Sequence, residues 1–441
     1  MVAGLAESTT RARDEQARQS KNIISMSFFF TLLDDSLRPR GSRDALGIEH
    51  LWSGVGRRLV GNLTTVTTHL DNFILTLVGF HICAGEKNGQ ADWESFERFE
   101  QLTARARVRC GLPGVIGIRR IRSSADFPVR LGSGTEARIL DNPRQGGLWG
   151  LYSSALASAG LTDGARRPTD VGMEIVRQFL DTAPDDVWRL ALDRRRTQID
   201  EAEMTRVQAW VSALVGSTPA RKALAERLLS GTSAHQSWHG EVFVQARACM
   251  ESRDDVPTAR DFLRWLTEES TLLRDFAGRL LWFDEALALS AVTFNWLLGC
   301  HGRSVKEIES QLASLEKWPF HEPVMPQFVD EIRDDEWRLR ANGLSRFCTA
   351  MANGEWHGAT ELLLEHHARV ARKRGGAPWC YWEDGHIKVV MNVTPGVLPV
   401  AEELAGERFS VWMDGHTHDF FLRSFLDILE QAGLVEQGET A

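Results

Sequence analysis

Residues 41–83 read GSRDALGIEHLWSGVGRRLVGNLTTVTTHLDNFILTLVGFHIC, a pattern that points to a helical protein. Apolar side chains recur at helical spacing over residues 46–55, which predicts an amphipathic helix with a basic end. Residues 62–68 contain four threonines, whose hydroxyls compete with the backbone for hydrogen bonds. We therefore expect the next helix to begin only at His69. It is apolar on nearly every side and too short to cross a bilayer, so it should be buried.

The order of these elements carries a resemblance. A Leu-Gly-Ile element, an amphipathic helix, a threonine-rich turn and an apolar helix are followed by Gly114-Val-Ile-Gly117 and Gly147-Leu-Trp-Gly-Leu-Tyr152. Over about the first 180 residues this order resembles a group of uncharacterised, mostly helical proteins of bacterial phage-defence gene clusters. The resemblance implies a helical fold and a place among defence-system proteins. It assigns no catalytic residue.

Length and cysteine usage are typical of a reduced, intracellular protein. A chain of 441 residues can form two or three domains with substantial cores. Its six cysteines include no Cys-x-x-Cys pair, which favours free, buried thiols over disulfides or a zinc ribbon. The polar N-terminus lacks the apolar core of a signal peptide, so we expect a cytoplasmic location and no membrane partner.

Charge and lysine usage argue against several enzyme classes. Of the 51 basic residues seven are lysines, which leaves 44 arginines. No lysine follows a glycine, so the phosphate-binding loop of ATP-driven motors is absent, and we expect no nucleotide cofactor. No lysine has an acidic residue two positions before it, so the Asp/Glu-x-Lys part of the motif of a common class of nucleases is also absent. A net charge of −9 opposes phosphate binding over the surface as a whole, so any such binding requires a local basic patch.

The rest of the chain predicts a multi-helical array with a small C-terminal α+β unit. Amphipathic helices are expected at residues 185–197, 201–215, 219–230, 238–251, 257–284, 286–299, 304–316 and 334–352. Three prolines between Trp318 and Pro326 cannot share one helix and indicate a boundary. We therefore expect three regions: a helical 1–145, a helical 146–317, and an α+β unit over 327–441.

The strongest strand signal is a hairpin near the C-terminus. Asp384-Gly385 is a two-residue turn signal, and Ile387, Val389 and Met391 alternate along the following strand. We expect the final helix of the chain to pack on this apolar face and cover it. A final helix is predicted over residues 419–431.

Residues 147–180 resemble the wing region of winged-helix DNA-binding domains. A helix ends at Gly160, a basic turn follows, and Thr169 caps a second helix, with Asp170 placed favourably against the helix dipole. Pro168 lacks the backbone donor that a wing strand needs, so an ordinary helical hairpin stays open as the alternative.

The most basic part of the chain is the window from Leu102 to Arg144, with three acids and nine arginines: Arg105, Arg107, Arg109, Arg119, Arg120, Arg122, Arg130, Arg138 and Arg144. It is either a solvated helix face running into a loop or a surface that contacts phosphates. A second basic cluster ends the helix that begins near Glu355, where cations also complement the helix dipole. The predicted nucleic-acid or partner-binding residues are Arg105, Arg109, Arg119, Arg120, Arg122, Arg166, Arg167, Arg372, Lys373 and Arg374.

Candidate catalytic patterns are incomplete. Asp414-Gly-His416-Thr-His418-Asp419 resembles the metal-binding start of an amidohydrolase, but too few residues follow it to supply the remaining ligands. His386-Ile-Lys388 lacks the aspartate that follows in phospholipase-D-type nucleases. His366 and His367 are adjacent, so they point about 100° apart around a helix and cannot chelate together. We expect neither a metal nor a cofactor.

These observations lead to the expectation of a non-catalytic subunit of a bacterial anti-phage defence assembly, which binds DNA or partner proteins through arginine-rich faces. Its expected partners are other defence-system proteins and nucleic acid. The alternative is a divergent nuclease or other hydrolase whose site is assembled only in the fold. Three or more of Asp414, His416, His418 and Glu383 around a concave site would favour the alternative.

Overall fold

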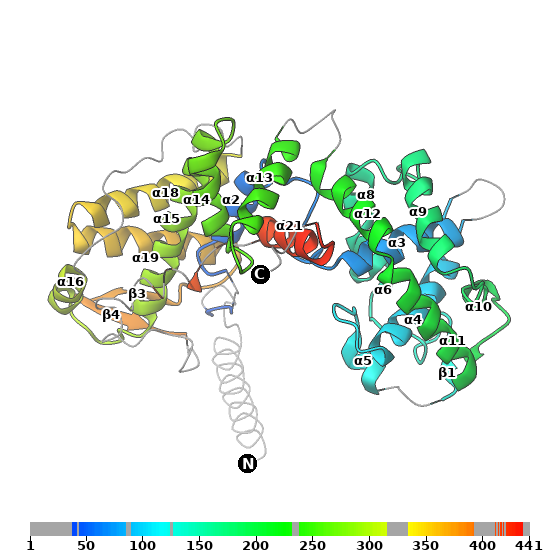
Figure 1. Ribbon diagram of the computed structural model, residues 1–441. Helices are drawn as coiled ribbons and strands as arrows, with labels where there is room; N and C mark the ends of the chain where they lie inside the picture. The colour runs from blue at the N-terminus through cyan, green and yellow to red at the C-terminus, as the bar shows by residue number, and fades with distance from the viewer. Residues whose placement is uncertain are drawn as a thin grey trace, which may run out of the picture. The chain divides into compact units, whose positions relative to one another are not determined.

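A computed structural model describes residues 38–41, 44–84, 90–123, 127–231, 238–314, 334–391, 411, 413, 415–416, 418 and 420–434. Within these ranges the protein is mainly helical, with two small antiparallel sheets (Figure 1), so the predicted fold class is confirmed. None of the helices described here has both the length and the apolar character that a membrane crossing requires. All six cysteines are free thiols, and five of them are buried.

The chain forms two compact units, each discontinuous in sequence. Unit 1 comprises Met1–Glu49 and Ala286–His416, and unit 2 comprises His50–Glu285 and Thr417–Ala441. The divisions fall inside α2 (Ile48–Gly56) and α15 (Arg274–Leu298). This grouping by spatial proximity differs from the three consecutive regions expected above, and the proline-rich boundary between them lies outside the described residues.

Unit 2 contains most of the helices. They are α3 (Leu70–Ile82), α4 (Trp93–Arg109), α5 (Ile118–Ser123), α6 (Pro143–Gly146), α7 (Leu148–Leu151), α8 (Ser153–Ser158), α9 (Asp170–Thr182), α10 (Arg189–Leu192), α11 (Glu201–Gly216), α12 (Thr218–Ser230), α13 (His239–Glu251), α14 (Ala259–Glu269) and α21 (Phe420–Gln431). Strands β1 (Val129–Arg130) and β2 (Gln198–Ile199) pair with Val129 opposite Ile199.

Helix α3 is the centre of unit 2. It begins at Leu70, directly after His69 as predicted, and every residue in it except His81 is buried. Helices α4, α7, α8, α9 and α12 all contact it, which explains why its sequence is apolar all round. The preceding threonines bond locally: the Thr64 N–H donates to the Thr67 hydroxyl oxygen at 2.7 Å.

Residues 147–180 form a helical hairpin. Helix α8 ends in a Schellman motif, since Gly160 has a φ of +69° and the Leu161 N–H donates to the Leu156 carbonyl at 2.9 Å. The Thr169 side chain caps α9 by accepting from the Gly172 N–H. Between them Thr162 and Pro168 make a single isolated bridge. These residues are all described and do not form the paired strands of a wing, so the helical-hairpin alternative fits this segment.

Three predicted helices differ from those observed, and one of them, predicted over 286–299, is the second half of α15 rather than a separate helix. The helix expected over 257–284 is divided into α14 and α15, because Ser270 caps the new helix by accepting from the Leu273 N–H at 3.2 Å. The helix expected over 185–197 is reduced to the four residues of α10.

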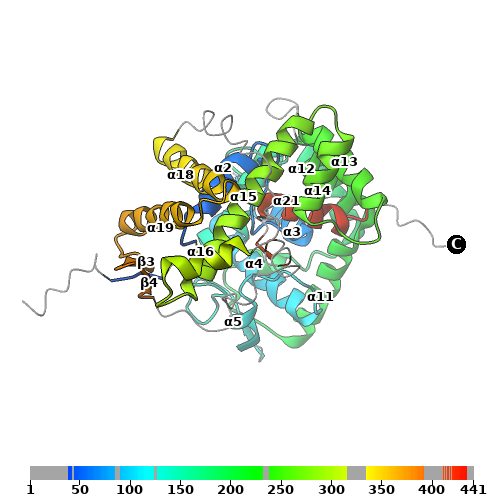
Figure 2. The ribbon, with the colours of Figure 1, turned by 90° about the vertical axis from the view of Figure 1, so that its left-hand side faces the viewer.

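Unit 1 contains the second half of α15, together with α16 (Val305–Ala313), α18 (Asp335–Ala352), α19 (Trp356–Lys373), β3 (Cys380–Glu383) and β4 (His386–Val389). Helices α18 and α19 lie side by side, and β3 packs against α19 (Figure 2).

The predicted C-terminal hairpin is confirmed. Asp384 and Gly385 both have positive φ, as a two-residue type I′ turn requires. Ile387 is buried while Val389 and Met391 are half-buried, so the apolar face is only partly covered. The edge of β4 that does not pair with β3 forms hydrogen bonds with residues 302–305. The Ile387 N–H, for example, donates to the Arg303 carbonyl at 2.9 Å.

Candidate nucleic-acid or partner interface

Most arginines of α4 belong to the interior of unit 2, while Arg109 at its C-terminal end is exposed. Arg105 is only 4% exposed, and its guanidinium donates to the carbonyls of Gln101 at 3.2 Å and Ala137 at 2.9 Å. Burial lowers the pKa of Arg105 to about 10. Arg107 is 2% exposed and bonds to the Asn72 side chain and the Pro113 carbonyl. The sequence predicts that Arg105 contacts a partner, and the structure contradicts this. Its guanidinium N–H groups are buried and donate to backbone carbonyls within unit 2.

Helix α5, in contrast, presents its arginines to solvent. Ile121 is buried with Val115 and Ile139, which anchors one side of the short helix. Arg119, Arg120 and Arg122 are exposed. Arg120 donates to Asp141 at 2.7 Å and so ties α5 to the segment that leads into α6. Arg119 and Arg122 have no carboxylate partner within the described part of the chain.

Trp149 is held in an aromatic cluster by the Gly147-Leu-Trp-Gly segment. Its ring centroid lies 5.3 Å from that of Trp93, 5.4 Å from Phe80 and 5.2 Å from Phe96. The glycines allow this approach: a Cβ at Gly147 would lie 2.6 Å from a Glu100 carboxylate oxygen, and one at Gly150 would collide with the Gln145 carbonyl.

Two arginines cover these indoles. The Arg166 guanidinium lies 4.5 Å from the Trp149 ring centroid, and that of Arg144 lies 5.9 Å from the Trp93 centroid. The Arg166 Nε donates to the Ser153 hydroxyl at 3.0 Å. Partial burial, and then the nearby charge of Arg144, lower the pKa of Arg166.

The remaining predicted arginines of unit 2 have identified contacts. Arg167 donates to Asp163 at 2.7 Å, Arg130 pairs with Glu136, and Arg109 stacks on the Phe127 ring at 4.2 Å. We use the name arginine surface for Arg119 and Arg122 on α5 together with Arg144 and Arg166 over the indoles, none of which makes an ion pair with a described acid.

The basic cluster at the end of α19 has local partners in unit 1. Lys373 pairs with Glu336 at 3.0 Å, and Arg374 with Asp44 at 3.6 Å, while Arg372 is exposed. Arg374 also lines a pocket of about 170 Å³ together with Arg40, His367 and Trp379. The pairing of Lys373 and Arg374 with carboxylates gives both cations a structural role.

The adjacent histidines of α19 bond to backbone groups. The His366 Nε2 lies 2.8 Å from the Leu46 carbonyl oxygen, and the His367 Nε2 accepts from the Trp379 N–H at 2.8 Å. Burial lowers the pKa of each to about 4, so both rings are neutral at pH 7.

The second histidine of the amidohydrolase-like pattern belongs to a buried ion-pair network. Asp284 accepts from Arg260 at 2.8 Å, and from the backbone N–H of His418 at 2.8 Å. The pKa of Asp284 is lowered although burial alone would raise it, because the His418 hydrogen bonds and the Arg260 charge favour the carboxylate.

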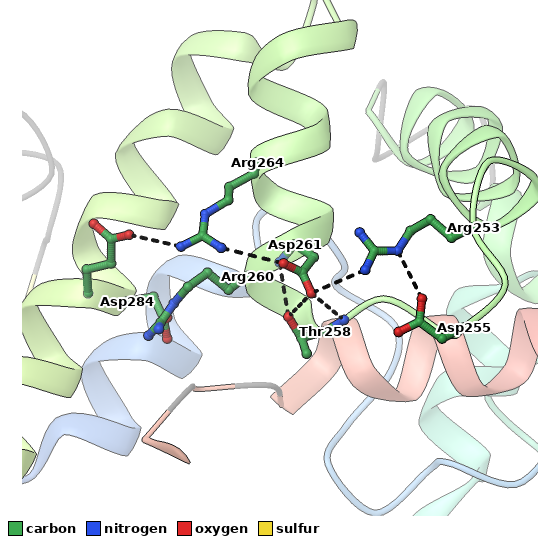
Figure 3. A network of polar contacts seen from close by, with 8 residues as sticks. Arg253, Asp255, Thr258, Arg260, Asp261, Arg264 and Asp284 are labelled. Atoms are coloured by element: carbon green, nitrogen blue, oxygen red, sulfur yellow. Dashed lines mark hydrogen bonds and ion pairs between the residues drawn. The ribbon is translucent and has the colours of Figure 1, made fainter. Parts of the chain in front are cut away.

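A separate set of contacts surrounds Asp261, the residue after Arg260 (Figure 3). Asp261 lies between Arg253 and Arg264 and forms a capping box with Thr258 at the start of α14. These contacts explain the local structure without a ligand.

No three His, Cys, Asp or Glu side chains gather as a metal site among the residues that the structure describes. His416 lies 3.0 Å from the Asn295 side chain, and Asp414 and Asp419 lie outside the described residues. The cluster that would favour a hydrolase is therefore not formed by the described members of the pattern.

Glu100 on α4 is a buried acid that the sequence does not single out. Its Oε1 accepts from the Leu148 N–H at 2.7 Å, while Oε2 has no hydrogen-bond partner within the described chain. Burial raises the pKa of Glu100 to about 8. It lines a cavity of about 10 Å³, the size of one water molecule, with Asn72 and Arg107.

Comparison of the chain with protein-family models, with curated proteins and with solved structures gave no match.

Proposed function

We propose that the protein is a non-catalytic subunit of a bacterial anti-phage defence assembly and that it binds DNA through the arginine surface. The observation that supports DNA binding is that Arg119, Arg122, Arg144 and Arg166 make no ion pair with a described acid. The net charge of the chain as a whole is −9, so these four cations are a local exception. Cations without a carboxylate partner keep their charge available for phosphates. The assembly context rests on the resemblance of the first 180 residues to proteins of phage-defence gene clusters.

The local geometry supports a continuous binding face. The Arg120–Asp141 ion pair links α5 to the turn before α6, and Arg144 lies in α6. Contacts from such a face go mostly to backbone phosphates, so binding should be weakly sequence-selective and strongly salt-dependent.

The test is fluorescence anisotropy with a labelled DNA duplex over a range of salt concentrations. If all four guanidinium groups contact phosphates, the log–log slope of affinity against salt is roughly −3.6. The double variant Arg119→Glu/Arg122→Glu should lose most of the binding and about half of that slope. Helix content should be unchanged, since both side chains are exposed.

The matched control is Arg195→Glu/Arg346→Glu, which makes the same charge change at two exposed arginines outside the arginine surface. It should bind with at most a small loss of affinity. If the wild-type protein binds no DNA at about 50 mM salt, where such contacts are strong, DNA binding is excluded and the arginines are reassigned to acidic protein partners. Hydrolysis of the duplex by the wild-type protein, lost in His418→Gln, would replace the proposal with the hydrolase alternative.

A further inference from the structure

Arg144, which is exposed, and Arg166, which is half-buried, are both held against aromatic rings. Each guanidinium lies over an indole, and the two indoles contact each other edge to face, with an interplanar angle of 79°. One pair of touching indoles on unit 2 therefore carries both cations, although they come from α6 and from the turn before α9. A cation over an aromatic face is stabilised without being neutralised.

The nearest carboxylates in the sequence are engaged elsewhere. Asp163, in the same turn as Arg166, accepts from Arg167, and Asp141, three residues before Arg144, accepts from Arg120 at 2.7 Å. The closeness of Arg144 is one of the two causes that lower the pKa of Arg166. Two like charges held together without a counter-charge destabilise each other, and an anion bound between them would remove that repulsion.

The backbone at Arg166 is also unusual. Its φ of +62° lies in the left-handed region, which favours glycine. The turn is fixed by Asp163, whose side chain accepts from the Ala165 N–H at 2.8 Å and the Arg167 N–H at 2.9 Å. An arginine in this conformation costs stability relative to glycine, and strained positions of this kind are common at functional sites.

We infer that Arg144 and Arg166 form a single phosphate-binding site and that its ligand is a phosphodiester group of the DNA backbone. This inference rests on the proposed DNA binding. Guanidinium groups are planar forks that bind phosphate oxygens in a bidentate manner, and two of them can hold one phosphate from two directions. The indole pair fixes both groups in advance, which reduces the entropy lost on binding.

The test compares Arg166→Gly with Arg144→Ala. Glycine adopts a positive φ without strain, so Arg166→Gly should keep a melting temperature within a few degrees of wild type. Its DNA affinity should fall roughly tenfold, because the contact to phosphate is lost. Arg144→Ala should show a similar loss, and each variant should reduce the salt slope by about 0.9. In Arg166→Lys the charge is kept but the fork is lost, so its affinity should lie between wild type and Arg166→Gly.

Arg189→Ala is the matched control. Arg189 also lies over a tryptophan, at 5.5 Å from the Trp188 ring, but it is paired with Asp186 at 2.8 Å. Its removal should leave DNA affinity and the salt slope unchanged. Equal losses in Arg189→Ala and Arg166→Gly would overturn the inference, because the effect would then be one of general charge.

Titration calorimetry with pyrophosphate separates this site from the proposed function. If the wild-type protein binds DNA and neither Arg144→Ala nor Arg166→Gly changes the affinity, the site is overturned while DNA binding through Arg119 and Arg122 stands. If the protein binds pyrophosphate through these residues but no DNA, the anion site stands and its assignment to DNA is overturned. If it binds neither, both are overturned.

Discussion

At the residue scale, Glu100 shows how burial determines the charge of a side chain. Its pKa of about 8 in the folded protein lies above the ordinary value of 4.5, because the carboxyl is enclosed by α4 and α7. The folded state therefore binds the proton more tightly than the unfolded state. The contribution of Glu100 to stability is complete below pH 4.5 and is lost as the pH rises through about 8.

We expect Glu100→Gln to become progressively more stable relative to wild type between pH 5 and pH 9. The amide keeps the oxygen that accepts from Leu148 but has no proton to lose, so the difference should grow to on the order of a few kcal/mol. Denaturant unfolding of both proteins at several pH values measures it. A difference in stability that is constant across this range would show that folding does not raise the pKa of Glu100.

The Asp284–Arg260 pair allows a comparison of buried and exposed ion pairs. Both side chains are at most 4% exposed, so Asp284→Asn leaves the Arg260 charge buried without its counter-charge. We expect a loss of about 3–5 kcal/mol in the free energy of unfolding. Asp141→Asn breaks the Arg120 pair, whose aspartate side chain is 92% exposed, and should cost less than about 1 kcal/mol. Similar costs for the two variants would contradict the burial argument.

At the element scale, the packing of α3 on α4 depends on Gly79. A Cβ at this position would lie 2.8 Å from both Phe96 and Phe99, so Gly79→Ala forces the two helices apart. We expect a cost of roughly 1–3 kcal/mol in thermal or denaturant unfolding. Gly216→Ala is the control, because the last residue of α11 has no atom within 4 Å of its added Cβ. It should be neutral or slightly stabilising, and an equal loss in both variants would remove the close-packing explanation.

The sequence predicts elements well where the signal is local. The Gly160 helix end, the Thr169 cap and the Asp384-Gly385 turn are each specified by one or two residues with distinct backbone or hydrogen-bond preferences, and all three are confirmed. The β1–β2 pair was not predicted, because two residues that meet across 70 positions leave no periodic signal. The amino-acid composition also gives a wrong prediction for Arg105 on α4, which it places on a binding surface. Helices α3, α5, α10 and α11 contact α4, so Arg98, Arg105 and Arg107 are buried and bond to backbone carbonyls, whereas Arg109 at the end of the helix is exposed.

At the scale of the whole molecule, the local basic face and the overall negative charge act over different distances. The arginine surface can attract phosphates only where the repulsion from the remaining surface, in a chain of net charge −9, is screened. The Debye length is about 10 Å at 0.1 M salt but about 30 Å at 0.01 M. At low salt, therefore, DNA bound at the arginines also experiences the distant acidic residues.

We accordingly expect DNA affinity to rise linearly on a log–log scale as salt decreases towards about 0.05 M, and then to flatten near 0.01 M. The measurement is anisotropy with two duplexes of unrelated sequence, which should give the same curve because phosphates carry no sequence information. Neutralising the exposed acids Asp254 and Glu268 as Asn and Gln should move the flattening to lower salt without changing the slope above it. A plot that stays linear down to 0.01 M would mean that the negative surface does not oppose binding, and that the arginine surface alone determines the affinity.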